Sequence, residues 1–364
     1  MARVSEKEIF LSIQKWSAEK ANEWYARQPW LVGANYNPAN AINEMEMWQA
    51  DTFDPKTIDL ELSWAQSLGM NTMRVYLHDL LWKQDAEGFR GRIEEFLTIA
   101  DTRGIKPLFV LFDSCWDPLP TLGAQRAPAP GYHNSGWLQS PGADALQDPT
   151  QYPRLQEYVT GVVGAFSQDE RILGWDVWNE PDNTNATSYG DKEPANKVDL
   201  VAALLPQAFA WARSANPKQP LTSGVWMGDW SSPDTLSATE KIQIAESDVI
   251  SFHNYGPAED FAKRVQQLEQ YGRPLLCTEY MARGAGSTFQ GSLPIGKEHR
   301  VAMINWGLVA GKTQTFLPWD SWEKPYTDRD PEIWFHEVFH TYGAPYRPAE
   351  TELIRELTAS ANGK

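Results

Sequence analysis

The sequence predicts an α/β protein whose eight parallel strands close into a (β/α)8 barrel, a TIM barrel, with an extra N-terminal helix and long loops on the C-terminal face. Two observations carry this prediction. A short apolar run, a polar loop and an amphipathic segment follow one another in eight cycles, and such alternation implies parallel strands joined by helical crossovers. The 364 residues, 42% of them hydrophobic, also suffice for one barrel core.

Eight apolar runs have the length of buried strands. They are residues 31–35, 72–77, 107–112, 172–179, 221–226, 249–255, 274–280 and 313–319. The segments between them carry apolar residues at helical spacing. In the clearest stripe, Ile93, Phe96, Leu97 and Ala100 stand at i, i+3, i+4 and i+7, and Gly104 follows as a stop signal.

The connections between these elements are unequal in length. Residues 1–364 are predicted to form one catalytic domain, with an N-terminal helical extension at 1–30, the barrel at 31–345 and a C-terminal helix at 346–364. The connections that leave strand ends are long and rich in Pro, Gly and Asn, at 113–150, 182–196, 281–297 and 320–330. Because barrel active sites are built from the loops after the strands, we expect the site on that face.

Composition limits the partners. A formal net charge of −16 argues against nucleic acid and anionic membrane, which attract clustered Lys and Arg, and favours a neutral substrate. No apolar stretch reaches the length of a membrane span. The start, MARVSEKEIFLSIQKW, lacks the apolar core of a signal peptide, so the chain as given is expected in the cytoplasm, or in the periplasm or outside if a signal has been removed. The oligomeric state stays undecided.

Two residue types complete this picture. The cysteines, Cys115 and Cys277, are too few for a metal cluster and are expected to be ordinary small apolar residues; we expect neither a metal nor a cofactor. The 17 tryptophans divide by position. Those predicted to pack within helices are Trp16, Trp24, Trp64, Trp211 and Trp306. Those at or beyond strand ends, several of which are expected to stack on a ligand, are Trp116, Trp137, Trp178, Trp226, Trp230, Trp319 and Trp322.

Two glutamates are predicted to face one cavity. Strand side chains alternate, so Asp176, Trp178 and Glu180 share a face, and Glu180 is the last of them, at the mouth. On the seventh strand the same parity brings Glu279 to the mouth. Paired carboxylates are the minimal equipment for splitting a glycosidic bond, because one protonates the departing oxygen and the other attacks the anomeric carbon.

The neighbouring strands supply polar and aromatic side chains. Arg74 on the second strand is expected to keep one carboxylate ionised, while His253 and Tyr255 on the sixth hydrogen-bond it. Trp319, at the end of the predicted eighth strand, is expected to form the floor under a sugar ring.

With these residues in place, the sequence resembles the retaining glycoside hydrolases of clan A, and most closely glycoside hydrolase family 5, the cellulase and mannanase family. The motifs that carry the resemblance are Arg74 in NTMRVYL, Asn179 and Glu180 in WNEP, His253 and Tyr255 in FHNY, Glu279 in TEY and Trp319 in LPWD. It implies that Glu180 is the acid/base, that Glu279 is the nucleophile and that Asn179 donates a hydrogen bond to the sugar 2-hydroxyl. Arg74 and Tyr255 would position Glu279, and His253 would line the proton-transfer side.

One motif departs from the family pattern. Many members carry His at the end of the third strand, whereas FVLFDSCW offers Asp113 there. His133, further along the same loop, is a candidate substitute. With Trp116 and Trp226 at strand ends, these residues complete the predicted sugar-binding set.

A retaining mechanism needs Glu180 protonated while Glu279 is ionised. We expect the apolar, tryptophan-rich setting and the nearby negative charge to raise the pKa of Glu180, and the two carboxyl groups to lie about 5 to 5.5 Å apart. A β-1,4-linked oligo- or polysaccharide is the favoured substrate, although the sequence does not identify the sugar. Nor does it decide between internal cleavage and removal of terminal units; a third loop that blocked one end of the cleft would favour the latter.

Three alternatives stay open. A non-catalytic carbohydrate-binding barrel is one, and the intact Glu180 and Glu279 argue against it. A transglycosylase would share every residue named and differ only in whether sugar or water resolves the intermediate. A metal-dependent barrel hydrolase is disfavoured, because the predicted strand ends lack clustered His and Asp ligands.

Overall fold

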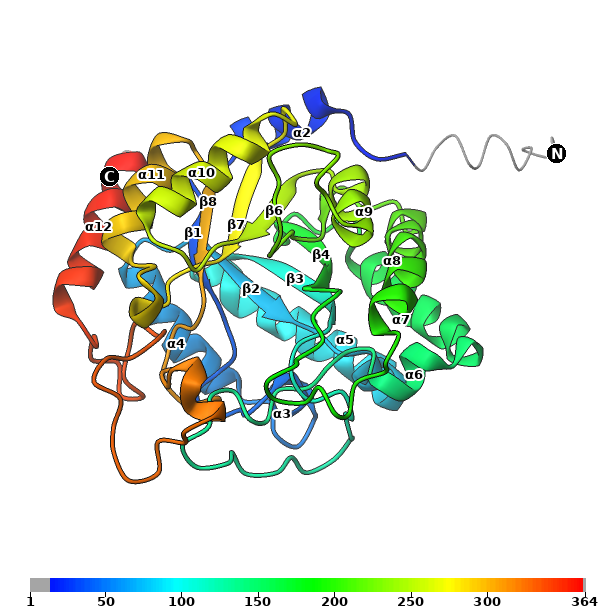
Figure 1. The fold of residues 1–364 in the computed structure, drawn as a ribbon, viewed down its shortest axis with the longest axis horizontal. Helices are drawn as coiled ribbons and strands as arrows, with labels where there is room; N and C mark the ends of the chain where they lie inside the picture. Colours follow the sequence, from blue (N-terminus) through cyan, green and yellow to red (C-terminus); the bar gives the residue numbers. More distant parts are fainter. Residues whose placement is uncertain (1–13, 363–364) are drawn as a thin grey trace.

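The computed structural model describes residues 14–362, which form a (β/α)8 barrel (Figure 1). The strands are β1 (Val32–Asn35), β2 (Thr72–Tyr76), β3 (Lys106–Asp113), β4 (Gly174–Asn179), β5 (Leu221–Thr222), β6 (Ile250–His253), β7 (Leu275–Glu279) and β8 (Ala302–Asn305). All ladders are parallel, in the order β5-β4-β3-β2-β1-β8-β7-β6. A bridge between Val225 and Phe252 joins the two ends of that order. The predicted fold class is confirmed.

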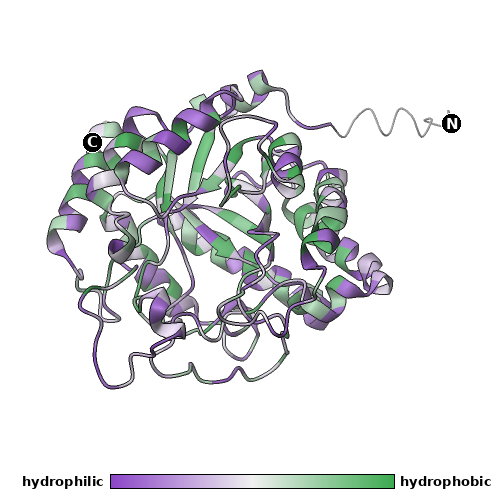
Figure 2. Cartoon of the chain, viewed as in Figure 1, coloured by the Kyte–Doolittle hydropathy of each residue, from purple (hydrophilic) through white to green (hydrophobic). Residues whose placement is uncertain are grey.

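Helices surround the barrel. They are α2 (Ala18–Ala26), α3 (Glu44–Trp48), α4 (Pro55–Ser67), α5 (Asp79–Thr102), α6 (Ala143–Gln147), α7 (Tyr152–Phe166), α8 (Lys197–Ser214), α9 (Ala238–Glu246), α10 (Ala258–Glu269), α11 (Phe289–Glu298) and α12 (Pro348–Ala361), with short 3-10 helices η1 (Pro149–Gln151), η2 (Arg283–Ala285) and η3 (Trp319–Trp322). Figure 2 shows mostly apolar strands inside this ring. Among residues 14–362, no helix combines the length and apolar character needed to span a membrane.

The predicted eighth strand is wrong. β8 is Ala302–Asn305, and residues 313–319 lie in the long connection after it. The error began one element earlier, because the helix α11 had been assigned to a loop. Its sequence, FQGSLPIGKE, contains Gly291, Pro294 and Gly296, which are poor helix formers. The strand was therefore sought at the next apolar run.

The N-terminal segment covers one end of the barrel. Ser17 caps α2 by accepting a hydrogen bond from the Lys20 N–H. Trp16 and Tyr25 pack in a buried cluster with Leu31 at the start of β1 and with residues near the starts of other strands. The predicted extension also includes residues 1–13, which lie outside the described residues. The loops that follow the strands lie at the other end of the barrel.

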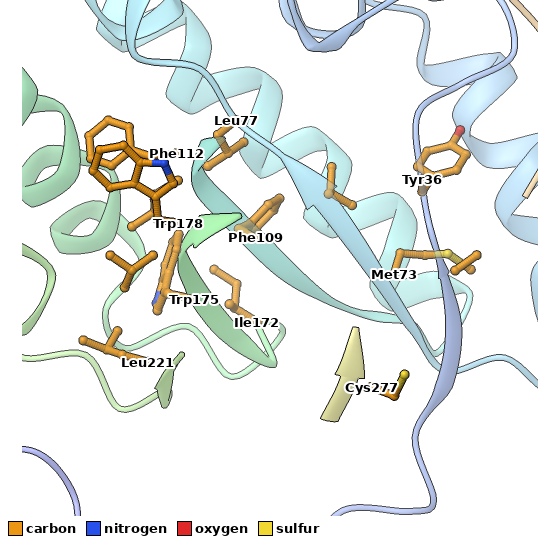
Figure 3. Packing of buried hydrophobic residues seen from close by; sticks show 14 of the residues in the cluster. Tyr36, Met73, Leu77, Phe109, Phe112, Ile172, Trp175, Trp178, Leu221 and Cys277 are labelled. Atoms are coloured by element: carbon orange, nitrogen blue, oxygen red, sulfur yellow. The ribbon is translucent and has the colours of Figure 1, made fainter. Parts of the chain in front are cut away.

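The main apolar core lies between the strands and the helices (Figure 3). The expected alternation on β4 is wrong at Trp178, which is fully buried and packs 5.0 Å, centroid to centroid, from Phe112. The alternation breaks before the strand ends, so the consecutive residues Asn179 and Glu180 both line the cleft. Two further tryptophans expected near the ligand, Trp137 and Trp230, are also buried.

Candidate active site

Glu279, at the end of β7, is held by three hydroxyl or guanidinium donors. Its Oε1 accepts hydrogen bonds from Arg74 Nη1 at 2.8 Å and from the Tyr76 hydroxyl at 3.1 Å. Its Oε2 accepts one from the Tyr255 hydroxyl at 2.7 Å. Because both oxygens are engaged from different strands, the carboxylate has a fixed orientation.

Arg74 ties four strands together behind this carboxylate. Besides Glu279, its fully buried guanidinium donates to Asp176 Oδ2 at 3.0 and 2.7 Å and to Asn179 Oδ1 at 2.7 Å. It also donates to Asn35 Oδ1 at 3.0 Å. Arg74 therefore balances two buried carboxylates and fixes which atoms of Asn179 face the cleft.

Glu180 follows β4 in a left-handed backbone conformation, with φ at +39°. A non-glycine residue with that φ is uncommon and strained, and the surroundings must enforce it. The Asn183 N–H donates to the Glu180 carbonyl at 2.9 Å, and the Ser114 hydroxyl donates to the Pro181 carbonyl at 2.9 Å. This turn aims the Glu180 side chain at the cleft.

Three groups surround the Glu180 carboxylate. His253 Nδ1 lies 2.8 Å from Oε1, while Asn183 Nδ2 donates to Oε2 at 2.7 Å and the Cys115 thiol to the same oxygen at 3.2 Å. A register shift between Phe252 and His253 pairs His253 with the end of β7, which brings it between the two glutamates.

The expectation of a raised pKa for Glu180 is wrong for the free protein. Burial does raise the pKa of Glu180, but the hydrogen bond and charge of His253 and the hydrogen bonds from Asn183 and Cys115 outweigh it and hold that pKa below its ordinary value. The sequence placed His253 nearby, but the two donors from the loops were not foreseen.

The two carboxylates are close enough to share a ligand. One oxygen of Glu180, one of Glu279 and a ring nitrogen of His253 all lie within 4.8 Å of one another. This trio could hold a metal ion, although the sequence predicts no cluster of ligands at the strand ends. For two members of the trio, Glu180 and His253, a hydrogen bond of 2.8 Å explains the closeness without an ion.

Asp113 lies behind the cleft. Its Oδ1 accepts hydrogen bonds from Asn179 Nδ2 at 2.9 Å and from the Cys115 N–H at 3.0 Å, and its Oδ2 accepts one from Trp137 Nε1 at 2.7 Å. It is not among the residues that line the cleft. Its position therefore suits orientation of Asn179, in place of the expected contact with sugar.

The cleft over the glutamates measures about 900 Å³, counted out to its mouth. Its lining residues are Cys115, Trp116, His133, Asn179, Glu180, Asn183, Asn185, Thr187, Trp226, Tyr255, Glu279, Trp306, Trp319 and Trp322. The predicted Trp116, Trp226 and His133 are thus at the cleft. Burial lowers the pKa of His133 to about 4, and its Nδ1 hydrogen-bonds the Leu317 carbonyl at 2.7 Å.

Two tryptophans of the cleft lie in other elements than the sequence predicts. Trp319 is at the cleft but lies on η3, in the loop after β8. Trp306, predicted to pack in a helix, directly follows β8 and lines the cleft. The apolar run VAMINW could have revealed it, since a tryptophan one step past a strand end has the position expected of a sugar platform.

Comparison with known proteins identifies a matching family and similar folds. A model of the cellulase family, glycosyl hydrolase family 5, matches residues 32–325. No curated protein gives a significant match. A GH5_18 variant from Streptomyces cattleya, in complex with Manβ1-4GlcNAc, aligns with a TM-score of 0.61 at 15% identity over 92% of this chain and 81% of its own.

Two further solved structures are similar. The endo-β-1,4-mannanase from Thermotoga petrophila aligns with a TM-score of 0.59 at 14% identity, over 93% of this chain and 78% of its own. An exo-β-1,4-mannosidase from an Opitutaceae bacterium aligns with a TM-score of 0.58 at 19% identity, over 91% of this chain and 60% of its own. At these identities the likeness shows the fold alone.

Proposed function

This chain belongs to the cellulase family, glycosyl hydrolase family 5, and is a glycoside hydrolase that acts on O-glycosyl bonds; from that premise we propose that it retains the anomeric configuration, with Glu279 as nucleophile and Glu180 as acid/base. The observation that carries the proposal is the closeness of the two carboxylates, with oxygens within 4.8 Å. Inverting enzymes keep their carboxyl groups about 6.5 to 9.5 Å apart to admit a water molecule. The closeness of the Glu180 and Glu279 oxygens therefore supports the retaining mechanism.

In the first step Glu279 attacks the anomeric carbon while Glu180 protonates the departing oxygen. The donors on both Glu279 oxygens hold its carboxylate in one orientation for the attack. The proton for the leaving group is delivered by Glu180, whose Oε1 lies 2.8 Å from His253 Nδ1. The first step therefore leaves a glycosyl ester on Glu279 and an ionised Glu180.

In the second step Glu180 acts as a base. With Glu279 esterified, the remaining carboxylate accepts a proton from water as that water attacks the anomeric carbon. Asn183 and Cys115 stabilise the ionised form of Glu180 needed at this stage. Arg74 donates to Asn179 Oδ1, and Asn179 Nδ2 donates one N–H to Asp113. The second N–H of Nδ2 is the proposed donor to the sugar 2-hydroxyl, because Asn179 lines the cleft.

The proposed substrate is a β-linked, and specifically β-1,4-linked, oligo- or polysaccharide. Similar structures include a mannanase, a mannosidase and a protein bound to Manβ1-4GlcNAc, so the mannose series is tested first. Tryptophans around the cleft, among them Trp306 and Trp226, offer the flat apolar faces on which sugar rings stack. No cofactor enters this mechanism, and we predict full activity in EDTA.

The test is a set of 2-deoxy-2-fluoro β-glycosides of mannose, glucose and xylose with good leaving groups, followed by peptide mass spectrometry. We expect one sugar to label the peptide that contains Glu279, because fluorine slows turnover of the glycosyl ester. Glu279→Gln serves as the control and should take no label. A label on another carboxylate, or inverted product from an aryl glycoside, would contradict the proposed roles.

A further inference from the structure

Two long connections meet above the barrel. The segment 313–326, which we call the β8 strap, belongs to the connection after β8 and lies against residues 129–134 of the connection after β3 (Figure 1). Backbone hydrogen bonds join Asn134 N to Thr313 O at 2.9 Å and Tyr326 N to Gly131 O at 3.0 Å. A Cβ on Gly131 would meet the Tyr326 backbone at 2.7 Å, so the two chains are in close contact.

Side chains strengthen this junction. Gln314 accepts from the Gly131 N–H at 3.2 Å and donates to the Ala129 carbonyl at 2.8 Å. Ser321 accepts from the His133 N–H at 3.0 Å, and Trp322 Nε1 donates to the His133 carbonyl at 2.9 Å. The β8 strap is therefore held in place by both backbone and side chains.

The helix η3 within the strap reaches both sides of the cleft. On one side Trp319 packs on Tyr255, which follows β6, with ring centroids 5.0 Å apart. On the other, Trp322 stacks on Trp116 of the loop after β3, with centroids 5.6 Å apart and an interplanar angle of 20°. The strap thus crosses the cleft from one wall to the other.

The roles of the glutamates locate the two halves of the substrate. Because Glu180 protonates the departing oxygen, the leaving group lies on its side, next to Asn183 and Trp226. The sugar that Glu279 attacks therefore lies on the other side, next to Trp306, which directly follows β8. Trp306 also borders a group of residues from the ends of β1 and β2, together with Asn134 and Thr313, which join the strap to the loop after β3.

The two ends of the cleft differ in accessibility. At the strap end, His133 is 1% exposed. Beneath the strap lies a second small cavity, whose polar lining residues include Asn35, Tyr76, Asn134, Thr315 and Glu337, all at most 4% exposed. A glycan cannot continue through so closed a wall. On the leaving-group side, Met227 next to Trp226 is 50% exposed.

We infer that this enzyme acts on chain ends, removing single sugars from the non-reducing terminus of β-linked oligosaccharides, because the β8 strap closes the cleft beyond the sugar bound at Glu279. The inference rests on the proposed function and adds the position of the cleaved bond. The leaving group, which extends through the open end, can be of any length.

The first test uses the wild-type enzyme and β-1,4-linked hexasaccharides of mannose, glucose and xylose whose reducing ends have been reduced to alditols. Mass spectrometry of early products should show a monosaccharide and a pentasaccharide that keeps the alditol. Early di- and trisaccharides would overturn the inference while leaving the proposed function intact. No turnover of these compounds or of aryl β-glycosides would reject both, and turnover of aryl monoglycosides alone supports a single-sugar pocket.

The second test loosens the strap. The double variant Gln314→Ala, Ser321→Ala removes side-chain hydrogen bonds of the junction, and Gln66→Ala, Ser67→Ala on the exposed face of α4 is the matched control. With thermal stability of both variants verified, we expect the strap variant to give about tenfold more internal cleavage of the hexasaccharide. An unchanged product pattern, with faster proteolysis of residues 313–326, would contradict closure by the strap.

Discussion

Two buried glutamates in this protein occupy opposite settings. Glu279, at the end of β7, accepts hydrogen bonds on both oxygens from Arg74, Tyr76 and Tyr255. Glu337, in the connection after β8, has φ at +52°, and its hydrogen bond from the Thr315 hydroxyl engages one oxygen only. Its Oε2 receives no hydrogen bond from the described residues, and burial raises the pKa of Glu337 to about 8.

The difference shows what the two parts of the molecule do. The strand ends surround the Glu279 carboxylate with donors that are already oriented. The loop region buries a carboxyl group with few donors and favours its neutral form. Chemistry therefore belongs to the strand ends, whereas the loops shape the space around them.

The largest effect is expected from Glu279→Ala. Without the nucleophile the glycosyl ester cannot form, and we expect kcat to fall on the order of 10⁵-fold for every leaving group. Glu337→Gln, an equally buried glutamate, is the matched control and should stay within a few-fold of wild type. Steady-state kinetics on aryl glycosides checks both, and added azide should restore turnover of Glu279→Ala as the α-glycosyl azide. A loss below tenfold would remove Glu279 from the nucleophile role.

Glu180→Ala is expected to lower kcat/KM by a smaller factor, and that factor depends on the leaving group of the substrate. Poor leaving groups need the proton, so their kcat/KM should fall about 10²- to 10⁴-fold, the usual contribution of a general acid. Dinitrophenyl glycosides, which leave without protonation, should form the glycosyl ester almost as fast as with wild type. Pre-steady-state measurements with both substrate types separate these steps. Equal losses for both would assign protonation to another group.

Glu337 should make stability depend on pH. Its pKa of about 8 in the folded state exceeds the ordinary value near 4.5, so between these values the folded state binds a proton that the unfolded state has lost. The free energy of unfolding should therefore fall as pH rises from 5 to 8, by on the order of a few kcal/mol. Urea unfolding of wild type and Glu337→Gln across this range should show that the free energy of unfolding falls less steeply with pH in the variant. Parallel slopes would mean that Glu337 is ionised when folded.

The smallest effect concerns Cys115, which was expected to be an inert apolar residue. Burial, followed by the nearby negative charge of Glu180, raises the pKa of the Cys115 thiol, so the thiol stays protonated and donates to Glu180. Cys115→Ala removes a donor that lowers the pKa of Glu180, so the limb of the kcat/KM profile that reports Glu180 should move to higher pH by roughly a few tenths of a unit. Cys115→Ser, which keeps a donor, should restore the profile. Identical profiles for all three proteins would limit Cys115 to packing.

The strand residues of the site could be located from sequence because the chain itself constrains them. A buried strand needs an apolar run, and its last side chains must lie at the barrel mouth, so the sequence predicts one cavity for Arg74, Glu180, His253 and Glu279. The error at β8 has an equally local cause, since glycines and a proline inside α11 conceal a helix that tertiary packing nevertheless stabilises.

The sequence by itself thus determined the barrel and the strand ends at which the two proposed catalytic carboxylates lie, since these depend on periodicity along one stretch of chain. Only the tertiary structure decided which loop residues reach them. Cys115 and Asn183 at Glu180, Trp306 at the cleft and the junction of Gln314 with Gly131 all join segments from different connections. Loops show no hydrophobic periodicity in the sequence, because their conformation is set by long-range hydrogen bonds and by packing of one connection on another.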